Sequence, residues 1–383
     1  MRAVSPGSPT DLLARVNRDV ERSLLRARNG VRYVRGTNRP KLGVTPKDVV
    51  WQRDKAQLWR YRGGPTRFEQ PLVIVTSLVS RSYILDLIPT SSSVEFLRDY
   101  GFDVFMIDWG IPDELEAAHR FETYVDEYLP RAIDAVIRET GAKEVTLVGY
   151  CLGGVLAFLY ANGHQDAPIR NLVLLATPVN YREMGPMVAA LVEGRLDADD
   201  LIDETGNVPA DVLYSGFYMM APTTVVAQNA TLLENLWNDE FVKGFQAVGQ
   251  WTRDQVPFPG AAFRQMVDDL IRRNVLMDGS WRLGGREIDF RTTGANVLNV
   301  MASADRVVPR AAAAPAGDLV GRPNRREEMV VKGGHATFGT GRSAFKHTLP
   351  SLADWIGSHS DARHETKGKP WRSDNSSSLT ATP

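Results

Sequence analysis

Cys151 is the only cysteine in a chain of 383 residues, and it lies in the centre of residues 149–153, Gly-Tyr-Cys-Leu-Gly. An apolar, β-branched stretch (145–148) precedes this motif, and a second apolar stretch (155–161) follows it. A nucleophile between two glycines at a strand-to-helix turn is typical of a nucleophile elbow, in which a strained turn exposes the central side chain. A Cβ at Gly149 or Gly153 would collide with neighbouring backbone. We therefore predict that Cys151 is a thiol nucleophile. The alternative is a small thiol buried in the core.

A cysteine nucleophile needs a general base and a group that orients the base. On sheets that carry a nucleophile elbow, these groups follow in the order nucleophile, acid, histidine. Asp305 follows the apolar stretch 297–301, and His335 follows the stretch 329–331. Both side chains would then lie at the ends of strands, on the same edge as the elbow. We predict that Cys151, Asp305 and His335 are the catalytic residues. The alternatives are an aspartate in a surface turn and a histidine in a glycine-rich loop.

An oxyanion hole would complete this site. The expected donors are the backbone N–H of Leu152, directly after the nucleophile, and an N–H near Val79 in the loop after residues 72–76. The other histidines are placed less well, because they precede the nucleophile, lie on helices or lie at the C-terminal end. They are His119, His164, His347, His359 and His364.

The elements that must position these residues alternate between strands and helices. Strands are predicted at 58–62, 72–76, 104–107, 145–148, 172–175, 297–301 and 329–331, and helices at 92–100, 121–140 and 155–161. This alternation predicts an α/β protein with a mostly parallel central sheet flanked by helices, the α/β-hydrolase fold.

Three regions depart from this alternation of strands and helices. Residues 1–43 are predicted to form an N-terminal helical segment. Its helix, 8–30, starts at Ser8 and stops at Gly30, and is either docked on the domain or in contact with a partner subunit or a lipid-like surface. Within a catalytic domain of residues 44–358, a helical insertion at about 180–274 is expected over the carboxyl edge of the sheet. Its Met and Trp side chains suit either a water-excluding cap or a core. Residues 359–383 are predicted to be a disordered tail.

Composition excludes several function classes. There are 45 basic and 46 acidic residues, so no net positive charge favours nucleic acid. A lone cysteine cannot form an internal disulfide, and no histidine spacing resembles a zinc site. No secretory signal or membrane-spanning stretch is recognisable, so a cytoplasmic setting is expected. The sequence has no phosphate-binding glycine loop, and we expect neither a metal nor another cofactor.

Several longer motifs are more specific than the elbow. The chain resembles the catalytic subunit of polyhydroxyalkanoate synthases, in particular the short class III type, from about residue 44 to 355. The segments that carry the resemblance are Thr45-Pro46-Lys47-Asp48-Val49-Val50, Tyr83-Ile84-Leu85-Asp86-Leu87, Val104-Phe105-Met106-Ile107-Asp108-Trp109-Gly110, Gly149 to Gly154, Phe258-Pro259-Gly260, Asp305 and Gly334-His335. Ser80, Arg306 and residues 336–339 depart from the family pattern close to the site, which bears on substrate choice and activity level.

The resemblance implies an acyltransferase that polymerises 3-hydroxyacyl-CoA into polyester and releases CoA. It also implies association with polyester granules, a homodimer and dependence on a second synthase subunit. The chemistry of sulfur independently favours a transferase. Attack of a thiolate on a CoA thioester exchanges one thioester for another, so the acyl group stays activated for transfer to an alcohol. Two alternatives remain: a cysteine hydrolase of esters or thioesters that uses the same three residues, and a non-catalytic granule-associated protein.

Overall fold

The computed structural model describes residues 9–37, 39–89, 91–220, 222–320 and 325–363. Its centre is an eight-stranded sheet with the order β1-β2-β6-β3-β7-β8-β13-β14. β1 pairs antiparallel with β2 and β2 with β6, and the remaining pairs from β6 to β14 are parallel. The predicted α/β architecture with a mostly parallel sheet is therefore confirmed. The sheet strands are β1 (Lys47–Arg53), β2 (Ala56–Tyr61), β3 (Leu72–Val75), β6 (Val104–Asp108), β7 (Val145–Tyr150), β8 (Ile169–Leu175), β13 (Asn296–Ala302) and β14 (Arg326–Val331).

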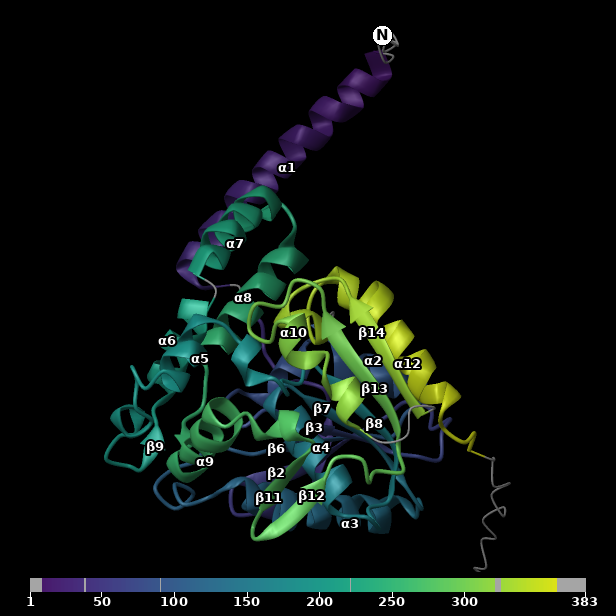
Figure 1. Ribbon diagram of the computed structural model, residues 1–383. Helices are drawn as coiled ribbons and strands as arrows, with labels where there is room; N and C mark the ends of the chain where they lie inside the picture. Colours follow the sequence, from purple (N-terminus) through teal and green to yellow (C-terminus); the bar gives the residue numbers. More distant parts are fainter. Residues whose placement is uncertain (1–8, 38, 90, 221, 321–324, 364–383) are drawn as a thin grey trace, which may run out of the picture.

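Helices pack on both faces of this sheet (Figure 1). The α-helices are α1 (Pro9–Arg35), α2 (Ser93–Tyr100), α3 (Leu129–Thr140), α4 (Leu152–Gly163), α5 (Pro186–Val192), α6 (Ala210–Met220), α7 (Pro222–Asn235), α8 (Asp239–Arg253), α9 (Gly260–Gln265), α10 (Arg310–Ala313), α11 (Ala316–Leu319) and α12 (Leu349–Ser358). Single-turn and π-helical segments lie at Ser82–Leu85, Thr123–Tyr128, Tyr181–Glu183, Asp199–Leu201, Met266–Arg272, Val275–Asp278, His335–Phe338 and Ala344–Thr348. Short pairs of strands form three small ribbons, β4 (Asp86–Ile88) with β5 (Ser91–Ser92), β9 (Asn207–Val208) with β10 (Phe258–Pro259), and β11 (Ser280–Leu283) with β12 (Arg286–Asp289).

The strands are apolar along their whole length because both faces of the sheet are covered. On β3, Val73 and Val75 pack with α3 and α4 in one core cluster, whereas Leu72 and Ile74 pack with α2 and α12 in the other. This is the period of two that a strand imposes on its side chains. A parallel sheet that is buried on both faces reads as a continuous apolar run, which explains why the short runs in the sequence predict the strands.

The prediction for the end of the N-terminal helix was wrong. α1 continues past Gly30 to Arg35, because a single glycine weakens a helix without stopping it. The predicted cap, Ser8, lies outside the described residues. Asn29 is buried and donates to the carbonyl of Leu236, whereas Leu13, Val20 and Leu24 are 64%, 55% and 67% exposed, so one part of α1 contacts the domain and another does not. α1 extends away from the sheet, beyond the other helices (Figure 1).

The beginning of the expected disordered tail is ordered. Ala362 pairs with Phe68 in an antiparallel bridge, and the backbone N–H of Glu69 donates to the carbonyl of Asp361. The tail prediction was therefore wrong for residues 359–363, because these backbone groups find partners in the segment before β3. The rest of the predicted tail, 364–383, lies outside the described residues.

The segment between residues 180 and 274 consists mainly of helices, α5 to α9. It reaches the carboxyl edge of the sheet, where Ser80 forms a bridge with Gln255 and the indole of Trp251 donates to the carbonyl of Arg81, at 2.9 Å. None of the helices in the described part of the chain is both long and apolar enough to span a membrane.

Candidate active site

Cys151 occupies a strained turn between β7 and α4. Its backbone dihedrals are φ 54° and ψ −122°, a conformation that residues with a side chain rarely adopt. Its N–H donates to the carbonyl of Leu175, the last residue of β8, at 2.9 Å, which holds the turn against the neighbouring strand. The side chain is partly exposed, and this exposure is at odds with a thiol buried in the core.

The glycines around Cys151 are required by close backbone contacts. A Cβ at Gly149 would overlap the Cα of Gly154, and a Cβ at Gly153 would overlap the carbonyl oxygens of Val75 and Thr76. Because these neighbours are backbone atoms, no side-chain movement relieves the overlap. Gly154 is equally constrained, by the side chain of Thr177. The two glycines singled out in the sequence, Gly149 and Gly153, thus lie where the elbow contacts its neighbours.

The structure brings His335 and Asp305 together at the same edge of the sheet. The Nδ1 atom of His335 lies 2.8 Å from Oδ2 of Asp305, whose side chain is fully buried. The other carboxylate oxygen of Asp305 accepts the N–H groups of Val307 and Val308, at 2.9 and 2.8 Å. These donors fix the carboxylate in the orientation that receives the imidazole.

The electrostatics of this group favour a protonated imidazole. Burial by itself lowers the pKa of His335, but the charges of Asp305 and of the Cys151 thiolate outweigh burial and raise this pKa to about 10. An imidazole with a raised pKa accepts a proton readily. The arrangement can therefore remove a proton from a thiol or an alcohol and stabilise the cation that results.

Tyr150, which the sequence analysis left without a role, supports the histidine. Its ring stacks on the imidazole of His335, with centroids 5.3 Å apart and planes at 26°. Its hydroxyl donates to the backbone carbonyl of His335, at 3.0 Å. The adjacency of Tyr150 to the nucleophile was the only signal in the sequence, since a strand-end tyrosine is usually a core residue.

The two proposed oxyanion donors come from segments that contact each other. Leu152 is the first residue of α4, so its N–H has no carbonyl one turn earlier to receive it. Val79 lies in the loop after β3, and the preceding residues Val75 and Thr76 lie directly against Gly153. The segment that leads to Val79 is therefore in contact with the first turn of α4.

Side chains from three regions hold the Val79 loop. The indole of Trp109 donates to the carbonyl of Thr76 at 2.8 Å, and the hydroxyl of Ser82 donates to Asp108. Asp108 also accepts the N–H of Gly110, at 3.0 Å. Asp108 and Trp109 thus have a structural role, because they fix the loop that follows β3. Trp251, from α8, holds the far end of the loop.

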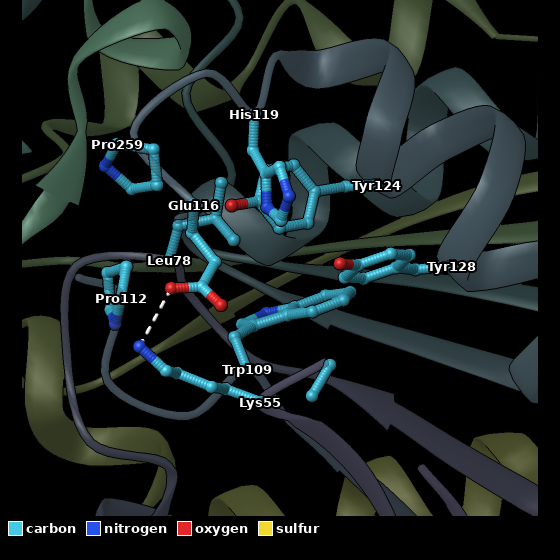
Figure 2. Close-up of a pocket in the computed structure, with 10 residues that line it drawn as sticks. Lys55, Leu78, Trp109, Pro112, Glu116, His119, Tyr124, Tyr128 and Pro259 are labelled. Carbon is cyan, nitrogen blue, oxygen red and sulfur yellow. Dashed lines mark hydrogen bonds and ion pairs between the residues drawn. The ribbon is translucent and has the colours of Figure 1, made fainter. Parts of the chain in front are cut away.

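A small cavity is lined in part by Leu78, which belongs to the same loop (Figure 2). It is lined by Leu78, Trp109, His119, Tyr124 and other residues. Its volume of about 10 Å³ has room for about one water molecule, which is too little for a substrate. His119 lies edge-on against Tyr124 in this cavity, with centroids 6.1 Å apart.

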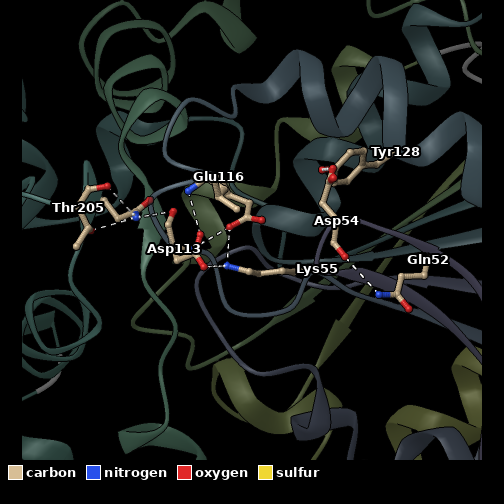
Figure 3. A network of polar contacts seen from close by, with 9 residues as sticks. Gln52, Asp54, Lys55, Asp113, Glu116, Tyr128 and Thr205 are labelled. Atoms are coloured by element: carbon tan, nitrogen blue, oxygen red, sulfur yellow. Dashed lines mark hydrogen bonds and ion pairs between the residues drawn. The ribbon is translucent and has the colours of Figure 1, made fainter.

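An ion-pair network anchors the chain that follows the Asp-Trp-Gly motif (Figure 3). The ammonium group of Lys55, between β1 and β2, lies 2.8 Å from Glu116 and also contacts Asp113. Glu116 additionally accepts the N–H of Asp113, at 2.9 Å. The network ties the antiparallel edge of the sheet to the segment that follows Trp109.

The remaining histidines are engaged elsewhere. His164 contacts Asp126 at 3.5 Å, and His359 stacks on Trp355 with centroids 4.2 Å apart. His347 lies on the helical segment before α12, and His364 is outside the described residues. In the part of the chain that the structure describes, no cluster of three or more His, Cys, Asp or Glu side chains is arranged to hold a metal ion.

Comparisons with known proteins agree with this geometry. Residues 71–341 match the family model of the alpha/beta hydrolase fold, and residues 12–97 match that of the poly-beta-hydroxybutyrate polymerase (PhaC) N-terminus. The poly(3-hydroxyalkanoate) polymerase subunit PhaC of Allochromatium vinosum is 32% identical over 82% of this chain and 89% of its own. The chain belongs to the poly(3-hydroxyalkanoate) polymerase family. The polymerase subunit of Thiocystis violacea is also 32% identical, over 83% of this chain and 90% of its own.

Solved structures place this polymerase family member among the α/β hydrolases by fold alone. A putative lipase from Sulfolobus solfataricus matches with a TM-score of 0.51 and 14% identity, over 84% of this chain and 97% of the lipase. A thermophilic esterase from Thermogutta terrifontis gives the same TM-score and identity, over 82% of this chain and 100% of the esterase.

Proposed function

We propose that the chain is the catalytic subunit of a polyhydroxyalkanoate synthase, an acyltransferase that polymerises 3-hydroxyacyl-CoA and releases CoA. Its relatives are named as poly(3-hydroxyalkanoate) polymerases over most of the chain. The observation that carries the proposal is a cysteine on a strained turn at the sheet edge where His335 and Asp305 pair at 2.8 Å. The residues proposed to act are Cys151 as nucleophile, His335 as base and Asp305 as its orienting partner.

In the first step, His335 takes the proton of Cys151 and the thiolate attacks the acyl carbonyl carbon. A carbon–sulfur bond to Cys151 forms, the bond to the sulfur of CoA breaks, and CoA leaves with the proton from His335. The N–H groups of Leu152 and Val79 stabilise the oxyanion. The product is a second thioester, so the step is nearly balanced in free energy.

In the second step, the 3-hydroxyl of another hydroxyacyl unit attacks this thioester. His335 removes the hydroxyl proton and returns it to the sulfur of Cys151 as the carbon–sulfur bond breaks and an ester bond forms. Conversion of a thioester to an ester is downhill, which drives chain growth. Asp305 keeps the imidazole in the tautomer and orientation that both proton transfers need.

Mass spectrometry of the full-length chain after incubation with 3-hydroxybutyryl-CoA tests this proposal. An acyl group on Cys151, release of free CoA and formation of polymer are expected, and Cys151→Ala should abolish all three. Free hydroxyacid as the sole product would instead identify a hydrolase. A Cys151 that is inert toward iodoacetamide and forms no acyl-enzyme would identify a non-catalytic protein.

We also propose that the chain works as a homodimer with a second synthase subunit at the surface of polyester granules. The exposed apolar side chains of α1, which include Leu13, Val20 and Leu24, support a partner for this helix. Light scattering and co-purification with granules, each with the chain before and after removal of residues 1–35, test this assembly.

A further inference from the structure

Three buried hydroxyl groups, on the segments that follow β3 and β8, have no hydrogen-bond partner among the described residues. They are Ser77 Oγ, after β3, and Thr177 Oγ1 and Tyr181 Oη, after β8. The three residues are 4%, 0% and 3% exposed. β3 and β8 are the two neighbours of β7, so these hydroxyls lie on the segments that leave the strands on either side of the elbow. A buried hydroxyl without a partner destabilises a protein, and such groups are rare unless a ligand or a water molecule completes them.

Hydrogen bonds from two other parts of the chain fix the backbone at Tyr181. The side chain of Asn274 accepts the N–H of Tyr181 at 2.9 Å and donates to the side chain of Asn180 at 3.0 Å. The carbonyl of Ala312 accepts the N–H of Asn180, at 2.9 Å. Tyr181 thus has a defined position although its own hydroxyl makes no hydrogen bond to any residue that the structure describes.

Backbone strain is concentrated around the same segment. Four non-glycine residues of the described chain have a positive φ, and three of them are Cys151, Ala176 and Asn274. Ala176 begins the turn that leads from β8 to Tyr181, and Asn274 is the residue that holds Tyr181. Strain of this kind persists where the surrounding structure enforces it, and it gathers at functional sites.

The pairing of β7 with β8 places the start of this segment next to the turn that holds Cys151. Tyr150 pairs with Leu175, and the N–H of Cys151 donates to Leu175. Two residues later, the side chain of Thr177 lies directly against Gly154 in the first turn of α4. Burial raises the pKa of the Tyr181 phenol, and the charge of Cys151 raises it further. The phenol therefore stays protonated and acts as a hydrogen-bond donor.

We propose that the Tyr181 hydroxyl donates a hydrogen bond to the oxygen on C3 of the acyl group bound at Cys151, and thereby selects 3-hydroxyacyl over unsubstituted acyl thioesters. The inference rests on the proposed function. The proposed oxyanion donor Val79 follows β3 and Tyr181 follows β8, so the two groups come from strands on opposite sides of β7. The C3 oxygen is an acceptor both as a free hydroxyl and as an ester oxygen of the growing chain, so one donor serves every round of elongation. A site that offers a buried donor discriminates strongly against an analogue without the acceptor, because the donor is then left unpaired.

The test compares acylation of Cys151 by 3-hydroxybutyryl-CoA and by butyryl-CoA, which lacks only the hydroxyl. The full-length chain and its Tyr181→Phe variant are followed by the initial burst of CoA and by mass spectrometry of the acyl-enzyme. We expect the unmodified chain to react roughly 100-fold faster with the hydroxylated substrate. In Tyr181→Phe the ratio of the two acylation rates should fall to about 10-fold or less, because only the reaction with the hydroxylated substrate becomes slower.

Tyr61→Phe is the matched control. Tyr61 is 3% exposed and its hydroxyl also lacks a partner among the described residues, but it lies on β2, three strands from β7. Tyr61→Phe should leave the substrate preference unchanged. The melting temperature of Tyr181→Phe should equal or exceed that of the unmodified chain, since the variant removes a hydroxyl that no folded-state contact satisfies.

The outcomes separate the inference from the proposed function. An unchanged preference in Tyr181→Phe, or an equal loss of rate with both substrates, would overturn the role of Tyr181 in selectivity. A lower melting temperature, with the preference kept, would show that the hydroxyl serves the fold and would also overturn it. If the unmodified chain forms no acyl-enzyme with 3-hydroxybutyryl-CoA, the proposed function itself fails.

Discussion

Helices α4 and α1 both carry apolar side chains, but those of α4 are buried and many of those of α1 are exposed. In α4, behind the nucleophile, eleven of the twelve residues are buried. In α1, the side chains of Leu13, Val20, Leu24, Val31 and Val34 are all more than half exposed. α4 follows β7 without a connecting loop and is followed within a few residues by β8, so the chain must lay it on the sheet. The C-terminal end of α1 leads into the catalytic domain.

Among the residues that the structure describes, contacts of α1 with the rest of the chain come from its middle and its C-terminal half. The Asn29 side chain donates to the carbonyl of Leu236 at 2.8 Å, and the ring of Tyr33 lies 6.5 Å from that of Phe245. The guanidinium of Arg22 lies over Trp237, at 4.7 Å. All three partners lie at or after the end of α7. The comparison teaches that an apolar periodic pattern predicts a helix, whereas its connections decide whether the helix is buried.

The largest difference between the two helices is expected when one glycine in each helix is replaced by alanine. Gly153→Ala in α4 places a methyl group against the carbonyls of Val75 and Thr76, so we expect a loss of about 4 kcal/mol or more, or failure to fold. Gly30→Ala in α1 meets nothing closer than a side-chain atom of Leu236 at 4.0 Å and should stabilise the helix by about 0.5–1 kcal/mol. Urea denaturation measures both. Equal effects of the two substitutions would contradict the distinction between the helices.

The pH dependence of stability sharpens the description of the catalytic edge. The pKa of His335 is raised from about 6.5 in the unfolded chain to about 10 in the folded chain. Its contribution to stability is therefore fully present below pH 6.5 and is lost as the pH rises through 10. In this window we expect unfolding free energy to fall by at most about 1.4 kcal/mol per pH unit.

Asp305→Asn should flatten this dependence, because the carboxylate that raises the pKa of His335 is gone. Denaturation at pH 6, 8 and 10 compares the two proteins. An identical slope in both would mean that Asp305 does not hold the imidazolium. Substitutions on α1, which lies away from this pair, should leave the slope unchanged.

Cys151→Gly separates strain from chemistry. Glycine adopts the φ of 54° freely, so the variant should gain about 1 kcal/mol of stability while acylation disappears. Calorimetry and mass spectrometry measure the two effects on one sample. A loss of stability would show that the sulfur contributes more by packing than the turn costs by strain.

The smallest effect is expected on the exposed face of α1. Replacing Leu13 and Leu24 by Gln should change stability by no more than about 0.5 kcal/mol, whereas Leu156→Ala in α4 should cost about 2–5 kcal/mol. Thermal denaturation at low protein concentration measures the loss of stability in the α1 double variant and in Leu156→Ala. A double variant on α1 that loses 2 kcal/mol would mean that this face is covered.

Much of the fold could be predicted from local patterns. The apolar run of β7, the glycine spacing of the elbow and the strand ends before Asp305 and His335 all carry their signal within a few residues. The strand β1 was missed, because an edge strand with an intermittent apolar pattern, Lys47–Arg53, resembles a loop. The end of α1 was misplaced because Gly30 is tolerated within a long helix.

The sequence by itself determined the order of the strands along the chain, the strained turn at Cys151 and the presence of an acid and a histidine after later strands. These features follow from residue types and short-range sterics. Only the tertiary structure decided that Tyr150 stacks on His335, that Trp109 and Trp251 hold the Val79 loop and that the Tyr181 hydroxyl is buried with no hydrogen-bond partner in the described part of the chain. Such contacts join residues from 30 to more than 180 positions apart, and no local pattern encodes them because they arise when β-strands align in a sheet and the helices close over its edge.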